Sequence, residues 1–225
     1  MNQIQLSEGL ILLSGIKNLG GRTRFSLKLG NSIAQKEKVL YLSFDEYKEK
    51  LQLMLKQMDV KLNKNFEINS CLNEFCIETY LEILTLIEAN NYSTIIINKL
   101  NTLLPDYRLM VGEFDFDFTL QTVIDSLLFI IRQFNCRIIL VDELPMHKIN
   151  LQILSESAKL SDIRFPRVLV NSCTQIFYLC YPAELGCIED QDGNDISDRI
   201  ELYNLKNENH EEELIILNNK ELKIY

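Results

Sequence analysis

The sequence predicts an α/β fold with a central, mostly parallel β-sheet and helices on both of its faces. Short apolar runs alternate with longer helical patterns along residues 10–182. The short runs are rich in Ile, Leu, Val and Tyr and barely alternate with polar residues, as in strands covered on both faces. Residues 198–225 instead place strand-like runs next to one another, separated by polar turns. We therefore expect parallel strands joined by helices, with an antiparallel extension at the C-terminal edge of the sheet.

Each predicted strand is an apolar run bounded by polar or turn residues. The five runs are LILLSG (10–15), KVLYLSF (38–44), STIIINKL (93–100), CRIILVDEL (136–144) and TQIFYLCYP (174–182). Residues 198–225 read as a strand, a polar turn, a second strand, another turn and a third strand. The acidic stretch IEDQDGNDISD (188–198) is expected to form a surface loop.

The predicted helices are the amphipathic segments that lie between these runs. They cover residues 24–37, 47–58, 77–91 and 118–135. The last segment shows the pattern most clearly, because its apolar residues recur at spacings of three and four on one face: Leu120, Ile124, Leu127, Leu128, Ile131 and Phe134.

Composition narrows the class of protein. A chain of 225 residues with 47% hydrophobic and 24% charged residues fits one globular domain over residues 1–225. The net charge of -9 argues against a general affinity for nucleic acid, which depends on Lys and Arg that neutralise phosphates. The N-terminus lacks the pattern of a secretory signal and no run reaches 18 apolar residues, so we expect no membrane association and a cytoplasmic location. The six cysteines show neither a CxxC pair nor zinc-ligand spacing, and we expect them to be buried thiols.

The stretch SGIKNLGGRTRFSLKLGNSIAQ (14–35) has the outline of a phosphate-binding loop, with a strand, a glycine-rich turn and a helix. In such a loop the backbone N–H groups surround the phosphates, a Lys contacts the β- and γ-phosphates, and a Ser or Thr holds Mg²⁺. If GRT stands for the usual Gly-Lys-Thr, Thr23 faces Mg²⁺ and the candidate ATP or ADP site consists of Gly15, Gly20, Gly21, Arg22 and Thr23. The loop is then one residue too long, and a wide planar guanidinium stands where a compact ammonium is expected.

In their order and spacing, these segments resemble the C-terminal motor domain of the DnaB family of replicative helicases, which is a RecA-like ATPase. Beyond the phosphate loop, the resemblance runs through VLYLSFDEYKEKLQLML, STIIINKLNTLL, CRIILVDELPMHKINLQ, KLSDIRFPRVLVNSCTQIFYLCYP and IELYNLKNENHEEELIILNNKELKIY. It covers nearly the whole chain, and its strength lies in the order of the segments. The resemblance implies a RecA-like P-loop fold, a site for ATP and Mg²⁺, and a role in DNA replication.

Within this resemblance, the positions that serve ATP hydrolysis are altered. The family's Walker B strand ends in an Asp that holds the Mg²⁺ shell. This chain has Asn98, an amide that can accept a hydrogen bond from a Mg²⁺-bound water molecule but brings no negative charge. The family's catalytic glutamate aligns with Asp45, which is one methylene shorter. The neutral amide that senses the γ-phosphate aligns with Glu143, a carboxylate that would repel it. In the final hairpin, only Lys206 can stand for the Lys and Arg that reach the neighbouring subunit's nucleotide.

Three functional hypotheses remain open. In the first, a degenerate motor domain with impaired or lost hydrolysis acts by binding a protein partner, such as a helicase subunit or a replication or recombination protein. In the second, the chain is an unconventional ATPase of the DNA helicase or translocase type that uses Arg22, Thr23 and Asp45. In the third, it is a sensor that binds ATP or ADP without cleaving it. Nucleic acid also remains a candidate ligand, because the phenylalanines of GEFDFDFTLQ (112–121) can stack on bases.

Overall fold

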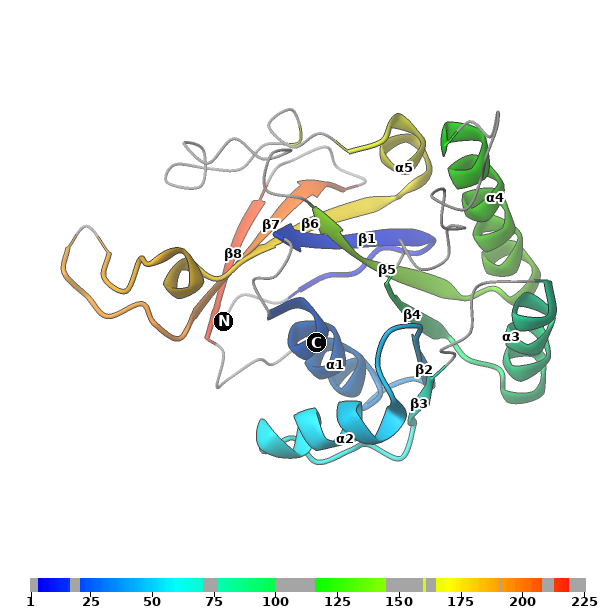
Figure 1. Cartoon of the computed structure of the whole chain (residues 1–225), viewed down its shortest axis with the longest axis horizontal. Coiled ribbons are helices and arrows are strands. Elements are labelled where there is room, and N and C mark those ends of the chain that lie inside the picture. Colours follow the sequence, from blue (N-terminus) through cyan, green and yellow to red (C-terminus); the bar gives the residue numbers. More distant parts are fainter. Residues whose placement is uncertain are drawn as a thin grey trace.

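Strand–helix units follow one another along most of the chain in the computed structural model (Figure 1). The structure describes residues 4–16, 21–70, 77–99, 116–144, 160, 165–190, 192–207 and 213–218. In chain order, its elements are β1 (Leu10–Ile16), α1 (Gly21–Ile33), β2 (Val39–Ser43), α2 (Lys48–Gln57), β3 (Phe66–Ser70), α3 (Ile77–Asn90), β4 (Thr94–Asn98), α4 (Phe116–Phe134), β5 (Arg137–Leu144), α5 (Arg167–Ser172), β6 (Gln175–Cys180), η5 (Pro182–Leu185), β7 (Arg199–Lys206) and β8 (Glu213–Asn218).

The described strands form one eight-stranded sheet with the order β3-β2-β4-β5-β1-β6-β7-β8. Every pair of neighbouring strands from β3 to β6 is parallel, whereas β6 pairs antiparallel with β7. At the other edge, β7 and β8 pair antiparallel. The predicted fold class, a mostly parallel sheet with an antiparallel hairpin at its C-terminal edge, is therefore confirmed.

Helices cover both faces of the sheet and divide the core into two layers (Figure 1). Side chains of α1 and α2 pack against one face, and those of α3, α4 and α5 pack against the other. Strand β1 supplies both layers, because Leu10 and Leu12 face one side while Ile11 and Leu13 face the other. All four are at most 1% exposed. Burial on both faces explains why the strand reads as an unbroken apolar run.

The sequence located the long elements and missed three short ones: β3, α5 and the 3₁₀ helix η5. All five apolar runs are strands, but the first helix begins at Gly21 and ends at Ile33 rather than covering 24–37. The missed strand β3 has the sequence FEINS and pairs only with β2 at the edge of the sheet, so polar residues interrupt its apolar pattern. The missed helix α5 has only six residues, too few to show a helical period. The third strand expected in 198–225 and residues 112–115 lie outside the described residues.

Among the described cysteines, Cys136, Cys173 and Cys180 are buried free thiols, as expected, whereas Cys187 is exposed. Burial raises the pKa of Cys136 to about 11, which keeps its thiol protonated and unreactive at neutral pH. No described helix is both long and apolar enough to cross a membrane.

Candidate functional site

Five residues selected from the sequence lie where parallel strands end. Gly15 of β1 lies opposite Glu143 of β5, and Asn98 is the last residue of β4. Asp45 follows the end of β2, and Arg22 lies in the first turn of α1. Because the carboxyl ends of parallel strands are where α/β proteins bind their ligands, this edge of the sheet is the candidate site.

Arg22 extends from the start of α1 back onto the strand ends. Its Nη1 donates a short hydrogen bond to the carbonyl oxygen of Gly15, and its Nη2 lies 2.8 Å from Oε1 of Glu143. The side chains of Arg22 and Glu143 are only 6% and 14% exposed. The guanidinium is therefore buried and paired with a carboxylate of the same chain.

Burial and the neighbouring carboxylates act on the charge of Arg22 in opposite directions. Burial lowers the pKa of Arg22, while the nearby carboxylates of Glu143 and Asp142 oppose that shift. Arginine nevertheless stays protonated at neutral pH. Removing one partner of a buried pair leaves an uncompensated charge and costs about 3–5 kcal/mol. Arg22 therefore cannot move to a phosphate without leaving the Glu143 carboxylate beside that phosphate.

Lys99, which no sequence motif indicated, joins this pair to Asp45. Its Nζ lies 2.8 Å from Oδ2 of Asp45 and 3.2 Å from Oε1 of Glu143. Burial disfavours the ammonium, but the hydrogen bonds and charges of Asp45 and Glu143 outweigh it and raise the pKa of Lys99. Its position directly after Asn98 was the available signal, because a residue that follows a buried parallel strand emerges at the carboxyl edge of the sheet.

Asp45 accepts two further hydrogen bonds. Asn98 donates from Nδ2 to Oδ1 of Asp45 at 2.9 Å, and Ser43 donates from Oγ to the same oxygen at 3.2 Å. Within the described residues, the buried Oδ1 of Asn98 has no hydrogen-bond partner. Rotating the amide would bring that oxygen against the carboxylate, so the hydrogen bond to Asp45 determines the orientation of Asn98.

These residues form one connected group, which we call the strand-end cluster: Arg22, Asp45, Asn98, Lys99 and Glu143. Its two cations and two anions balance, and each cation lies within 2.8 Å of a carboxylate. Asp45 already accepts hydrogen bonds or an ion pair from three side chains, which leaves it poorly placed to orient a water molecule.

The glycines of the predicted loop pack closely against other parts of the protein. A Cβ added to Gly21 would lie 1.8 Å from the ring of Tyr181, whose hydroxyl donates to the Gly21 carbonyl oxygen at 3.2 Å. A Cβ added to Gly15 would lie 2.8 Å from the carbonyl oxygen of Leu179. The cavity beside Arg22 and Tyr181 measures only about 10 Å³, which holds at most one water molecule. Packing by itself is thus enough to require glycine at both positions.

The other predicted site residues are not part of this cluster. Thr23 lies in the first turn of α1, and no hydrogen bond within the described residues links its side chain to the cluster. Lys206 donates from Nζ to the carbonyl oxygens of Val170 and Cys173 at the end of α5. Gly20 lies outside the described residues.

The described residues do not offer a Mg²⁺ shell in this arrangement. Asn98 presents its amide N–H to Asp45, and Asp45 is engaged by three donors. No group of His, Cys, Asp and Glu side chains suited to a metal ion occurs within the described part of the chain.

Comparison with known proteins supports the fold. No protein-family model matches the chain, and no characterised protein matches it in sequence. One similar solved structure is a DnaB-like replicative helicase, reported with its interactions with primase (TM-score 0.68, 14% identity, 94% of this chain and 56% of that chain). Another is an ATPase domain (TM-score 0.70, 13% identity, covering 95% of this chain and 84% of that chain). A third is a KaiC-like protein from the hyperthermophilic archaeon Pyrococcus horikoshii OT3 (TM-score 0.61, 13% identity, covering 92% of this chain and 83% of that chain).

At these low identities, the similarity shows the fold: a RecA-type domain of the kind found in DnaB-like helicases. The chain spans 56% of the length of the DnaB-like helicase and 84% of the similar ATPase domain.

Proposed function

Because the chain has the fold of a DnaB-like helicase ATPase domain, we propose that it is a degenerate motor domain with impaired or lost ATP hydrolysis. On this proposal it acts as a binding or regulatory protein in DNA replication or recombination. Its partner is a protein, such as a helicase subunit or a replication or recombination protein. The observation that carries the proposal is the strand-end cluster, whose cations are already neutralised inside the chain.

The charges of the strand-end cluster explain why we expect it to bind ATP weakly. ATP carries several negative charges, and a site that binds it must present a net positive field. In the strand-end cluster, a phosphate that approaches Arg22 or Lys99 also meets Glu143 and Asp45. Two like charges 4 Å apart repel by about 4 kcal/mol at an effective dielectric constant of 20. That repulsion weakens binding by about a thousandfold.

The test is calorimetric titration with ATP and with ADP, each with and without Mg²⁺. We expect no saturable binding by the wild-type chain at millimolar nucleotide. We expect weak binding to appear in Glu143→Gln, because the amide still accepts a hydrogen bond from Arg22 while the cluster gains a net positive charge. Glu46→Gln is the matched control, since Glu46 pairs with the half-exposed Lys50 outside the cluster.

The alternative hypotheses predict different results. Saturable binding by the wild-type chain that is lost in Arg22→Ala, but kept in Arg24→Ala, would overturn the proposal and favour a nucleotide sensor. Turnover of ATP stimulated by single-stranded DNA would instead favour the unconventional ATPase that uses Arg22, Thr23 and Asp45. Arg24 is a suitable control because it is an exposed residue on the same helix.

A cytoplasmic location is part of the proposal. The described cysteines are free thiols, as expected in a reducing compartment. With a net charge of -9, the chain is expected to bind DNA weakly, so that a protein partner carries its function.

A further inference from the structure

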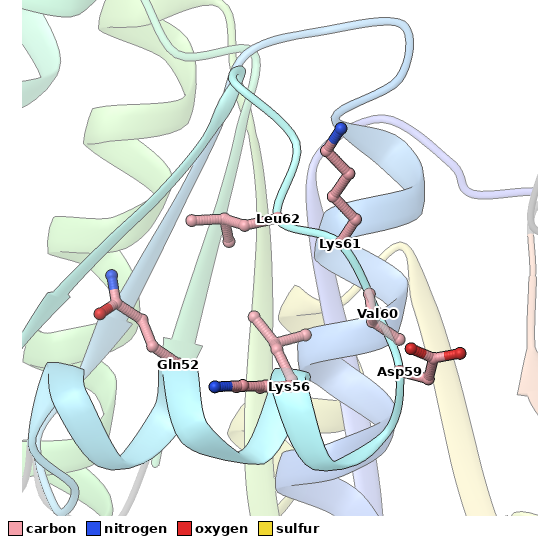
Figure 2. Close-up of a pocket in the computed structure, with 7 residues that line it drawn as sticks. Gln52, Lys56, Asp59, Val60, Lys61 and Leu62 are labelled. Atoms are coloured by element: carbon pink, nitrogen blue, oxygen red, sulfur yellow. The ribbon is translucent and has the colours of Figure 1, made fainter.

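A pocket distant from the strand-end cluster lies between α2 and the segment that leads into β3 (Figure 2). Its volume is about 350 Å³, within the range of about 300–1,000 Å³ that is usual for ligand pockets. We call it the α2 pocket; it is lined by Gln52, Leu55, Lys56, Asp59, Val60, Lys61 and Leu62. Its surface is more apolar than polar, and its basic side chains come from both the helix and the segment.

The end of α2 forms the floor of the pocket. Asp59 adopts a left-handed conformation with φ of 55°, which ends the helix. The N–H of Val60 then donates to the carbonyl oxygen of Leu55, and the N–H of Asp59 donates to that of Lys56. This is the Schellman arrangement, in which the side chains at the positions of Leu55 and Val60 pack together. The helix stop thus places two apolar side chains at the base of the pocket.

Asn31 of α1 fixes the opposite wall. Its side chain is 8% exposed and donates from Nδ2 to the carbonyl oxygen of Lys61 at 3.1 Å. Its Oδ1 accepts a hydrogen bond from the N–H of Asn63 at 2.8 Å. Because the backbone on both sides of Leu62 is held by a buried side chain, Leu62 remains 42% exposed at the pocket's edge. The pocket is therefore formed before any partner binds.

The pocket lies in a basic part of an acidic protein. Residues 48–64 carry five lysines and two acidic residues, while the whole chain has a net charge of -9. Within the described residues, no ion pair holds Lys56 or Lys61. An occupant should therefore combine an apolar side chain with negative charge.

The same chain presents a segment with this chemistry between η5 and β7. Residues 188–190 and 192–198, which we call the acidic loop, carry five acidic side chains and no basic one. Ile188 at its start is 58% exposed, and Glu189 and Asp192 are exposed as well. The N–H of Ile196 donates to the carbonyl oxygen of Ile188, and Glu189 bridges to Asp195, so the loop is a short hairpin. It projects at the left of Figure 1, away from α2.

The pocket and the loop of one chain cannot meet. The pocket precedes β3 and the loop follows β6, so they lie at opposite ends of the parallel strands. Five strand spacings also separate β3 from β6, which at about 4.8 Å each amounts to roughly 24 Å. A contact between them therefore needs two molecules.

We propose that the acidic loop of one copy docks in the α2 pocket of another copy of this chain. Ile188 enters the apolar part, and Glu189 and Asp192 face Lys56 and Lys61. Because the two surfaces differ, the contact is head-to-tail and extends to a ring or to a filament. No residue of the strand-end cluster takes part, so the proposed function stands or falls independently of this contact.

Sedimentation velocity over a concentration series tests the proposal. The wild-type chain is expected to associate with rising concentration, and less so at 1 M salt, where the screening length falls to about 3 Å from about 10 Å at 0.1 M. Lys56→Glu with Lys61→Glu reverses the sign of the two positive charges at the pocket. Glu189→Lys with Asp192→Lys reverses the sign of the two loop charges that face them. Each double variant alone is expected to stay monomeric.

Mixing the two double variants is the decisive arm. Each then offers the surface that the other needs, so the equimolar mixture is expected to associate again. Restored association also shows that both variants are folded. Glu88→Lys with Asp125→Lys changes the net charge as much as the loop variant does, but on the exposed surfaces of α3 and α4, and is expected to associate like the wild type.

Three results would overturn the proposal. In the first, the wild-type chain stays monomeric at every concentration. In the second, the charge-reversed double variants associate as the wild type does. In the third, the mixture remains monomeric although each variant unfolds as cooperatively as the wild type. If a synthetic peptide of residues 187–198 bound a monomeric wild-type chain, the pocket would belong to an acidic partner other than a second copy.

Discussion

The strand-end cluster and the α2 pocket both gather basic side chains, and they use them in opposite ways. Arg22 and Lys99 are largely buried, and each is held by a carboxylate of the same chain. Lys56 and Lys61 line an open pocket without a described ion-pair partner. A cation that is neutralised internally stabilises the fold but attracts little from outside, whereas an unpaired one is available to a partner. Pairing and burial, rather than the number of basic residues, therefore decide which surface can bind an anion.

The largest effect is expected from breaking the strand-end cluster at Glu143, which contacts both of its cations. Glu143→Ala leaves Arg22 buried without its carboxylate and should lower the free energy of unfolding by about 3–5 kcal/mol. Urea denaturation followed by circular dichroism measures the loss. Glu46→Ala is the control, because its pair with the half-exposed Lys50 should contribute less than about 1 kcal/mol. Equal losses in the two variants would show that the cluster is not the buried network described above.

A smaller effect is expected at the wall of the α2 pocket. Asn31→Ala removes the hydrogen bonds to Lys61 and from Asn63, and should cost about 1–3 kcal/mol of unfolding free energy. Because the wall then loosens, association of the chain should weaken as well. Denaturation and sedimentation of the same samples measure both changes, with Arg24→Ala on the exposed side of α1 as the control. If Asn31→Ala lowered the stability but left association unchanged, the wall held by Asn31 would not be part of the docking surface.

The smallest effect concerns the pH dependence of Lys99. Its pKa is raised in the folded protein, so its contribution to stability is complete below the unfolded-state value of about 10.4 and is lost as the pH rises through the folded-state pKa. The stability difference between the wild type and Lys99→Gln should therefore be constant near neutral pH and shrink above about pH 10.4. Buried tyrosines such as Tyr41, whose pKa burial also raises, are present in both proteins and cancel in the difference. A difference that stays constant to about pH 11 would contradict the pairing of Lys99.

How far the sequence predicts this protein differs between the fold and the site. Long apolar runs such as LILLSG and the helical period of 118–135 were sufficient, because burial on both faces of a sheet and on one face of a helix leaves a pattern in consecutive residues. The pattern failed for β3, where an edge strand has a single neighbour and tolerates polar residues. It also gave the first helix the wrong start, because Gly20 and Gly21 read as turn residues although Gly21 is the first helical residue.

The fold class, and the placement of Gly15, Asn98 and Glu143 at strand ends, could be predicted from the order of apolar runs in the sequence. The folded structure was needed to show that Arg22 is neutralised by Glu143, that Lys99 joins that pair to Asp45, and that Gly21 is needed to pack Tyr181. Secondary structure follows from neighbours along the chain, which the sequence displays. An ion pair depends on side chains that come from strands far apart in the sequence, and their distance is set only when the whole sheet has formed.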